Sequence, residues 1–294
     1  MKLLLRLGIP LLGIVLLLSS CATLAPRQRP YYEFQGMAEK GTIVVTVDAV
    51  KEQKTVNMAF PSLQEFAKRS TRISLALTSA SKAYPLGLDQ IAMYGVVDGD
   101  YPRFLVNTGM MYAREFTQEH SDNGLTWFSR KDGDFSLYAP KNNTLIFTNA
   151  SYEKAFEQVA AKKVLIDDQK AAKMANAAIA VYAYEPQTFF DLGLDLSQTV
   201  ISQAKEMLLL FDQKSEGGYT MDAYISMDTP KLANTLSQMV RSGYLARLKK
   251  DRIPFKIADL MQMFFIEDDL VTIKHMDVGE EQVQLIKQSL TGLL

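Results

Sequence analysis

Two short stretches of the sequence resemble each other, and this internal similarity constrains the fold more than any other feature. Residues 124–132 (GLTWFSRKD) and 243–251 (GYLARLKKD) share their first glycine and a final Lys-Asp pair preceded by a basic residue. A β-branched run at 42–47 opens the first half, and a similar strand-like run at 178–184 opens the second. Such a pattern is typical of a supersecondary unit that occurs twice. The sequence therefore predicts a tandem duplication, against the alternative that the matching block arises by chance.

Both halves show the same predicted order of elements: strand, helix, hairpin, helix, hairpin and helix. The first hairpin is placed at 91–97 with 103–106, and its counterpart at 207–211 with 220–227. Strands joined by short turns form antiparallel pairs. The predicted class is α+β, a tandem duplication of a mixed α/β unit with mainly antiparallel sheets and amphipathic helices packed on them. The predicted bounds are 38–161 for the first α/β repeat, 162–176 for a linking helix and 177–294 for the second α/β repeat.

The second half contains an extra segment, 252–262, which leads into 263–266. Drawn as a helix from Pro254, it has a wide apolar arc. One interpretation is a helix buried between the halves. The other is a helix that inserts into a bilayer interface, flanked by Arg247, Lys249, Lys250 and Arg252 for lipid phosphates. The residues assigned to lipid contact are Phe255, Ile257, Leu260, Met261, Phe264 and Phe265.

The start of the chain has the pattern of an export signal. Lys2 and Arg6 precede an apolar run that is too short for a stable spanning helix and ends in Leu-Ser-Ser-Cys at 18–21. These four residues resemble the lipobox of bacterial lipoprotein precursors. The resemblance implies that the signal peptide, 1–20, is cut off and that Cys21, the single cysteine, is acylated. The alternative is an ordinary secretory leader with an incidental cysteine. Prolines at 26 and 30 then predict a flexible lipidated tether over 21–37.

No motif in the sequence indicates catalysis or a cofactor. The 32 basic and 33 acidic residues are nearly balanced, which argues against nucleic acid as a partner. His120 and His275 have no neighbours at metal-ligand spacing. The acidic pairs at 98/100, 132/134 and 268/269 lie in predicted hairpin turns rather than in a carboxylate or calcium site. Nucleophile-elbow, Walker and dinucleotide glycine patterns do not occur. We therefore expect no enzyme activity, no cofactor and no metal.

The lipobox at Cys21, the proline-bearing tether and the duplicated body with amphipathic helices together resemble the treponemal outer-membrane-associated lipoproteins. This resemblance implies that helices insert into the outer membrane from its periplasmic leaflet and alter its permeability. Ala22, where an aspartate would retain a lipoprotein in the inner membrane, implies the same location. The helical segments carried over are 194–205, 230–240, 254–263 and 280–290, which add Val200, Ile201, Leu232 and Leu236 to the lipid-binding residues.

Two other functions remain open at this point. The same apolar faces could line the cavity of a periplasmic carrier of lipid or another hydrophobic ligand, or clamp an envelope protein in an assembly module. A structural interaction module exposed on the cell is the third interpretation. Helical periodicity is identical in all three cases. The expected partners are therefore membrane lipid, through Cys21 and the amphipathic helices, and possibly an envelope protein.

Overall fold

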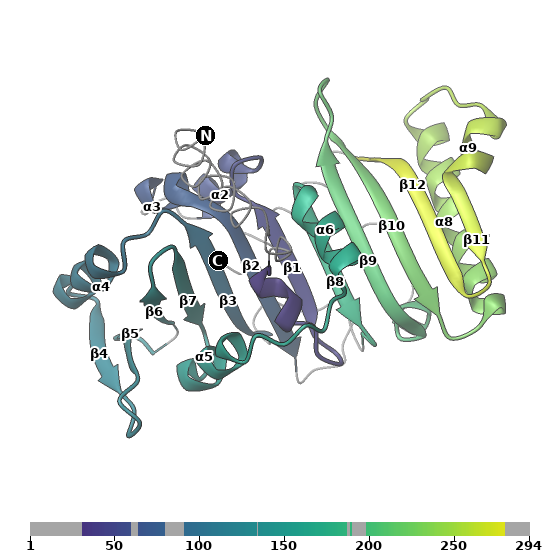
Figure 1. Ribbon diagram of the computed structural model, residues 1–294. Helices are drawn as coiled ribbons and strands as arrows, with labels where there is room; N and C mark the ends of the chain where they lie inside the picture. Colours follow the sequence, from purple (N-terminus) through teal and green to yellow (C-terminus); the bar gives the residue numbers. More distant parts are fainter. Residues whose placement is uncertain are drawn as a thin grey trace, which may run out of the picture. The chain divides into compact units, whose positions relative to one another are not determined.

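The central feature of the protein is one sheet of 12 strands, all paired antiparallel (Figure 1). The computed structural model describes residues 31–59, 64–79, 91–133, 135–186, 189 and 198–279, and its elements all lie in the unit Glu33–Leu294. The strands are β1 (Ile43–Asp48), β2 (Ser70–Ser79), β3 (Ile91–Gly99), β4 (Phe116–His120), β5 (Thr126–Arg130), β6 (Ser136–Lys141), β7 (Thr144–Thr148), β8 (Ile179–Tyr184), β9 (Ala204–Gln213), β10 (Tyr219–Met227), β11 (Phe264–Glu267) and β12 (Leu270–Val278).

The two halves of the chain build this sheet with the same strand order. The order is β11-β12-β10-β9-β8-β1-β2-β3-β7-β6-β5-β4, so that β1 and β8, the first strand of each half, pair at the middle. Outward from this pair, β1-β2-β3-β7-β6 corresponds to β8-β9-β10-β12-β11. The predicted α+β class with a mainly antiparallel sheet is confirmed. The duplication is visible as a repeated strand order within a single sheet.

Corresponding positions near the middle of the sheet differ in a compensating way. In the first half, Gly95 of β3 lies opposite Leu75 and Phe147. A Cβ atom at Gly95 would overlap the Phe147 ring and come within 2.9 Å of the Leu75 side chain. In the second half, Ala223 of β10 lies opposite Leu209 and Ile273. The first half thus pairs a glycine with a phenylalanine, and the second half pairs an alanine with the smaller isoleucine. The total side-chain volume stays similar because interiors pack to nearly constant density.

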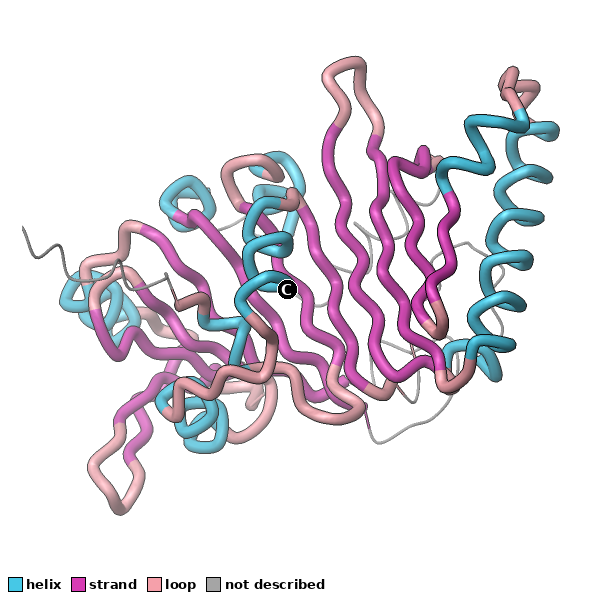
Figure 2. The backbone as a smooth tube through the Cα atoms, turned by 45° about the vertical axis from the view of Figure 1, so that its right-hand side comes forward, coloured by secondary structure: helices cyan, strands magenta, loops and turns pink. Residues whose placement is uncertain are grey.

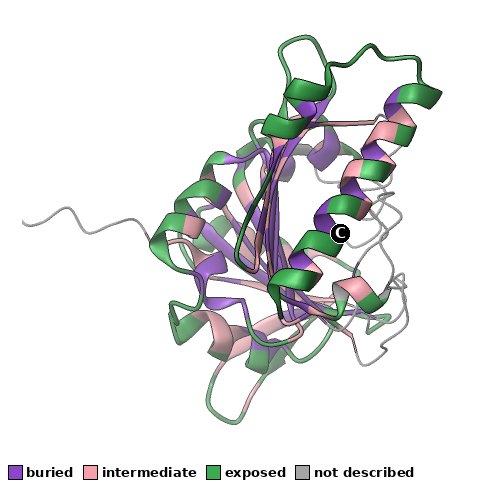
Figure 3. Cartoon of the chain, turned by 90° about the vertical axis from the view of Figure 1, so that its right-hand side faces the viewer, coloured by how far each residue is buried: buried purple, intermediate pink, exposed green. Residues whose placement is uncertain are grey.

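The helices cover the two faces of the sheet unequally (Figure 2). The long helix α8 packs on the second half, and its buried residues form a stripe toward the sheet (Figure 3). Thr229 caps α8 by accepting from the Leu232 amide, and Pro230 occupies its first turn. The helices are α2 (Gln53–Ala59), α3 (Gln64–Arg69), α4 (Arg103–Tyr112), α5 (Tyr152–Ala160), α6 (Asp168–Asn176), α7 (Gln198–Ile201), α8 (Pro230–Lys250), α9 (Ile257–Met263) and the 3-10 turn η1 (Glu33–Gly36).

Side chains alternate between two buried layers along each central strand. Ile43, Val45 and Val47 of β1 belong to the core cluster that also contains the buried stripe of α8. The other face carries a buried cross-strand row in which Val44 lies opposite both Ala76 and Tyr182. Helix α6 packs on β1 and β8, and η1 packs on β2 and α5. Both faces of the sheet centre are thus buried.

Several predicted boundaries were wrong. The segment 103–106, predicted as a strand, forms the first turn of α4. Strand β3 pairs instead with β2 and β7, and the sequence analysis missed β2. The matching blocks are not equivalent, because 124–132 forms a turn and β5 whereas 243–251 forms the end of α8. The helix predicted at 194–205 ends at Ile201, and β9 begins at Ala204.

The remaining differences concern the ends of elements. The linking helix begins at Asp168, capped by the Asp167 carboxylate, rather than at 162. The helix predicted from Pro254 begins at Ile257. Residues 33–36, assigned to the tether, form η1 and bury Phe34 completely. The leader at 1–20, Cys21 and the final helix predicted at 280–290 lie outside the described residues.

Candidate functional site

The segment between α8 and β12 carries the largest part of the predicted lipid-contact residues, and one side of it is exposed. Helix α9 and the edge strand β11 end the second half of the sheet. Ile257 keeps 73% of its surface exposed and Met261 keeps 59%, both high values for large apolar side chains. We call this apolar set the α9 surface; its members are Ile253, Phe255, Ile257, Met261, Phe265 and Ile266.

The opposite side of the same segment belongs to the protein core. Leu260 is only 5% exposed, and the Phe264 ring lies 6.4 Å from the Tyr244 ring with the Arg241 guanidinium 5.4 Å away. The assignment of Leu260 and Phe264 to lipid contact was therefore wrong for this conformation, because both side chains attach the segment to α8 and the sheet. The predicted apolar arc placed Ile257 together with Leu260 and Phe264, whereas the structure exposes Ile257 and buries the other two.

The other predicted lipid-contact residues also divide by burial. Leu236 of α8 is buried in the core, so its assignment to lipid was wrong in this conformation. Leu232 and Val200 are partly buried and pack against that core. Ile201 lies in α7, and its side chain is outside the described part of the structure. Of the predicted lipid-contact residues whose side chains are described, the exposed ones are thus Phe255, Ile257, Met261 and Phe265, and the α9 surface adds Ile253 and Ile266.

Basic side chains precede the α9 surface in the chain. Arg247 is held in place, since its guanidinium donates to the Asp277 carbonyl and lies 4.9 Å from the Tyr244 ring centre. Lys249, Lys250 and Lys256 are exposed and form no ion pair within the described ranges. The acidic turn at 267–269 lies at the far end of β11. Positive charge therefore concentrates on the α8 side of the surface.

A second exposed apolar surface lies on α4, at the opposite end of the sheet from α9 (Figure 1). No residue of this helix is fully buried. Phe104 is 75% exposed and Tyr112 is 78% exposed, while Val106 and Met110 turn toward the core. The α4 surface consists of Phe104, Leu105, Met111 and Tyr112. Its sequence signal is a pair of large apolar residues repeated after seven positions, which is two helical turns.

Helix α4 is nevertheless firmly attached. The Asn107 side-chain amide donates to the Ala139 carbonyl at 3.0 Å, and its Oδ1 accepts from the Ala139 amide at 3.1 Å. The Arg103 amide also donates to the Asn142 side chain at 2.9 Å. These bonds and the packing of Val106 and Met110 hold one side of the helix on the sheet, so the α4 surface faces outward. Sequence reasoning missed this surface because it assigned 103–106 to a strand and began the helix at 107, which divided the apolar residues of α4 between two elements.

Titratable groups in the described ranges do not gather into a catalytic arrangement that we can identify. Burial, and then the nearby Glu33 carboxylate, raise the pKa of Asp98 to about 6. His275 is exposed and lies 3.5 Å from the Asp222 carboxylate. The described portion contains no group of three or more His, Cys, Asp or Glu side chains that could hold a metal ion. It also contains no helix with the length and hydropathy needed to cross a bilayer.

Comparison with known proteins identifies a related fold. No protein-family model and no curated protein matches the sequence. Crystal structures of TP0453, a treponemal protein, do match. Crystal form I has a TM-score of 0.60 at 11% identity, and the match covers 89% of this chain and 99% of that one. Form III has a TM-score of 0.57 at 10% identity, with 89% and 100% covered, and form IV has 0.55 at 9%, with 88% and 97% covered. At this identity the match establishes a shared fold.

Proposed function

We propose that the protein is a lipid-anchored envelope protein whose α9 surface inserts into the outer membrane interface and alters its permeability. The observation that carries the proposal is that one short segment buries Leu260 and Phe264 in the core and exposes the apolar residues of the α9 surface. Such accessible patches on soluble folds mark interaction sites. The fold shared with TP0453, a treponemal envelope protein, supports an envelope location.

The size of the surface fits interfacial binding. Full burial of a large apolar side chain contributes about 1.5–3 kcal/mol. Six side chains that are roughly half exposed would contribute on the order of 5 kcal/mol, before the entropy lost on binding. Each nearby lysine adds about 1 kcal/mol at an anionic surface. Helix α9 has 7 residues, which is too few to span a bilayer, so its contact with the membrane would be limited to the interface.

The acylated Cys21 and the α9 surface would have different tasks. More than one acyl chain on Cys21 anchors a protein stably without further help. The α9 surface would instead fix how the folded unit lies on the bilayer, and apolar side chains inserted into one leaflet would expand that leaflet. Such expansion is a physical route to increased permeability. The α4 surface provides a second contact of the same kind. The proposal assigns no catalytic activity to the protein.

A vesicle-binding comparison tests this function. The protein with Cys21→Ser, which removes the acylation site, is mixed with vesicles containing anionic phospholipid, and bound protein is separated by flotation. Ile257→Ser combined with Met261→Ser should strongly reduce flotation and dye release. The matched control combines Val50→Ser with Met58→Ser, since these residues are 68% and 58% exposed and lie outside both apolar surfaces. Equal flotation of the two variants would contradict the proposal and favour the carrier or assembly-module function.

A further inference from the structure

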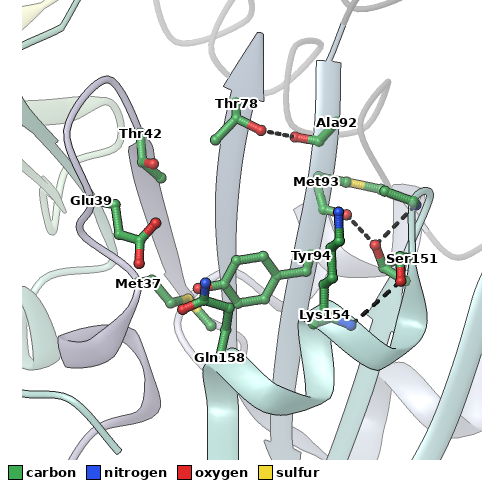
Figure 4. A pocket seen from close by; sticks show the side chains of 13 residues that line it. Met37, Glu39, Thr42, Thr78, Ala92, Met93, Tyr94, Ser151, Lys154 and Gln158 are labelled. Atoms are coloured by element: carbon green, nitrogen blue, oxygen red, sulfur yellow. Dashed lines mark hydrogen bonds between the residues drawn. The ribbon is translucent and has the colours of Figure 1, made fainter. Parts of the chain in front are cut away.

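A pocket on the α5 side of the sheet has no role in the proposed membrane contact. It lies between α5, strands β2 and β3, and the segment before β1 (Figure 4). Its cavity volume is about 190 Å³. This is somewhat more than the cavity of about 150 Å³ that binds benzene in an engineered protein. The pocket therefore fits a small organic molecule and is too small for a complete acyl chain.

Most of the pocket wall is apolar or already satisfied. Met37 and Ala155 are buried, and the Tyr94 ring extends across the pocket (Figure 4). The Thr78 hydroxyl donates to the Ala92 carbonyl at 3.2 Å, and the Thr148 hydroxyl donates to the Met93 carbonyl at 2.6 Å. These bonds satisfy the hydroxyl hydrogens of two of the polar residues that line the pocket.

Two polar groups in the pocket differ from the rest. The Lys154 ammonium has no ion pair or hydrogen bond with any described residue. The Gln158 Oε1 atom is buried and accepts no hydrogen bond from any described residue. Both residues lie on α5, four positions apart, so they share one side of the helix. Buried carbonyl oxygens nearly always have a donor. The pocket thus combines an available cation with an acceptor that lacks a donor.

We propose that this pocket binds a small carboxylate that also carries a hydroxyl or amino group on a short aliphatic chain. The carboxylate would pair with Lys154, and a charge-assisted bond of that type is among the stronger ones in proteins. The hydroxyl or amino hydrogen would satisfy Gln158 Oε1. The aliphatic part would contact Met37, Ala155 and the Tyr94 ring. A plain fatty acid lacks the second group and would leave Gln158 unsatisfied.

Glu39 should affect an amino acid ligand and a hydroxy acid ligand differently. Its carboxylate lies on the opposite side of the pocket from Lys154 and forms an ion pair with Lys163 at 3.3 Å (Figure 4). An amino acid would place its ammonium group in the field of this carboxylate, whereas a hydroxy acid would not use it. Binding of leucine that is stronger than binding of leucic acid therefore indicates an amino acid ligand, and the reverse order indicates a hydroxy acid.

Calorimetry with three probes of the same carbon skeleton tests the proposal. Leucine, leucic acid and isocaproate are titrated into the full-length protein in detergent. Leucine or leucic acid should bind more tightly than isocaproate, because isocaproate has no donor for Gln158. Lys154→Met should weaken binding of the preferred probe about tenfold or more, as expected for the loss of a charge-assisted bond. Lys250→Met, an exposed lysine on α8 outside the pocket, is the control and should change nothing.

Gln158→Met gives a second measurement that does not depend on Lys154. It should reduce binding of leucine and leucic acid to the level of isocaproate while raising the melting temperature of the ligand-free protein, because a buried acceptor without a donor is removed. The proposal is overturned if neither leucine nor leucic acid binds at concentrations on the order of 10 mM, or if Lys154→Met leaves their affinity unchanged in a folded protein. Neither α9 nor α4 residues line the pocket, so vesicle binding can fail without affecting this result.

Discussion

Strands β6 and β11 are the last ones at which the two halves of the sheet correspond, and beyond them the halves differ. The first half continues with β5 and β4, whereas the second half ends at β11. After the third strand of each half, the first has α4 with 10 residues and the second has α8 with 21. In the second half the long helix α8 covers the core. In the first half two further strands extend the sheet, and the shorter helix α4 leaves apolar residues exposed.

The two halves share their strand order, but short stretches of similar sequence do not identify which elements correspond. Residues 124–132 and 243–251 look alike but form β5 in one half and the end of α8 in the other. Each block takes the conformation that its surroundings stabilise, because local propensity is a weak determinant compared with tertiary packing. The exposed apolar residues also differ in origin. On α9 they lie opposite fully buried apolar side chains, and on α4 they lie opposite a side that combines the hydrogen-bonded Asn107 with the partly buried Val106 and Met110.

The largest effect is expected from removing the core side of α9. Leu260→Ser combined with Phe264→Ser should lower the free energy of unfolding by several kcal/mol, since each substitution leaves a cavity and buries a hydroxyl. The matched change in the first half, Phe104→Ser with Leu105→Ser, should stay within about 0.5 kcal/mol because both residues are exposed. Urea unfolding followed by circular dichroism measures both. Similar losses in the two variants would remove the distinction between the helices.

A smaller effect is expected at the corresponding sheet positions. Gly95→Ala should cost about 1–3 kcal/mol, because its methyl group overlaps the Phe147 ring. Phe147→Ile should restore much of that stability in the double variant, since it reproduces the Ala223 and Ile273 pair of the second half. A double-mutant cycle of thermal unfolding measures the coupling. Additive losses would mean that the two halves do not pack equivalently at this position.

Two aspartates, one in each half, should contribute to stability with opposite dependence on pH. The pKa of Asp98 is raised to about 6, so the stability gained from its protonated form is present below about pH 4 and is lost as the pH rises through 6. Two pKa units correspond to about 3 kcal/mol, reduced to about 1–2 kcal/mol by incomplete burial. Asp98→Asn should therefore raise the melting temperature at pH 7 and change it little at pH 4.

Asp222 supplies the comparison in the second half. Burial would raise its pKa, but hydrogen bonds from the His275 amide and the Lys274 ammonium outweigh burial and lower it. The stability contributed by the Asp222 carboxylate is present above its unfolded pKa and is lost as the pH falls through the folded value. Asp222→Asn should lower the melting temperature at pH 7. A melting temperature that changes in the same direction for both aspartates would contradict the assignment of their pKa shifts.

The strands that could be predicted from the sequence are those with the most continuous apolar runs. The runs that became β1 and β8 are nearly all apolar, and both were predicted. Strand β2 was missed although 73–77 is buried, because Ser70, Thr71 and Arg72 give its start a polar appearance. Helix α4 was misassigned because Phe104, Leu105 and Val106 form a short apolar run, which has the same pattern in a strand and a helix.

The candidate site was predictable in location but not in orientation. The extra segment was identified from sequence, and Ile257, Met261 and Phe265 do lie on an exposed side. Periodicity defines the sides of a helix, but the choice of the side that faces the core depends on what packs against it. Here Tyr244 and Ile273 receive Phe264, and they come from α8 and β12. The Lys154 pocket could not be predicted, because it forms only when α5 packs on strands β2 and β3.

The most direct test of the central claim measures the depth of the α9 surface in a bilayer. Cys21 is the single cysteine, so Ile257→Cys in a Cys21→Ser background provides one site for a spin label, and Met58→Cys provides an exposed control. With vesicles that contain anionic phospholipid, the label at position 257 should become accessible to oxygen dissolved in the lipid and protected from a water-soluble nickel complex. The label at position 58 should remain accessible to the nickel complex. Equal accessibility of both labels to the nickel complex in the presence of vesicles would contradict insertion of the α9 surface.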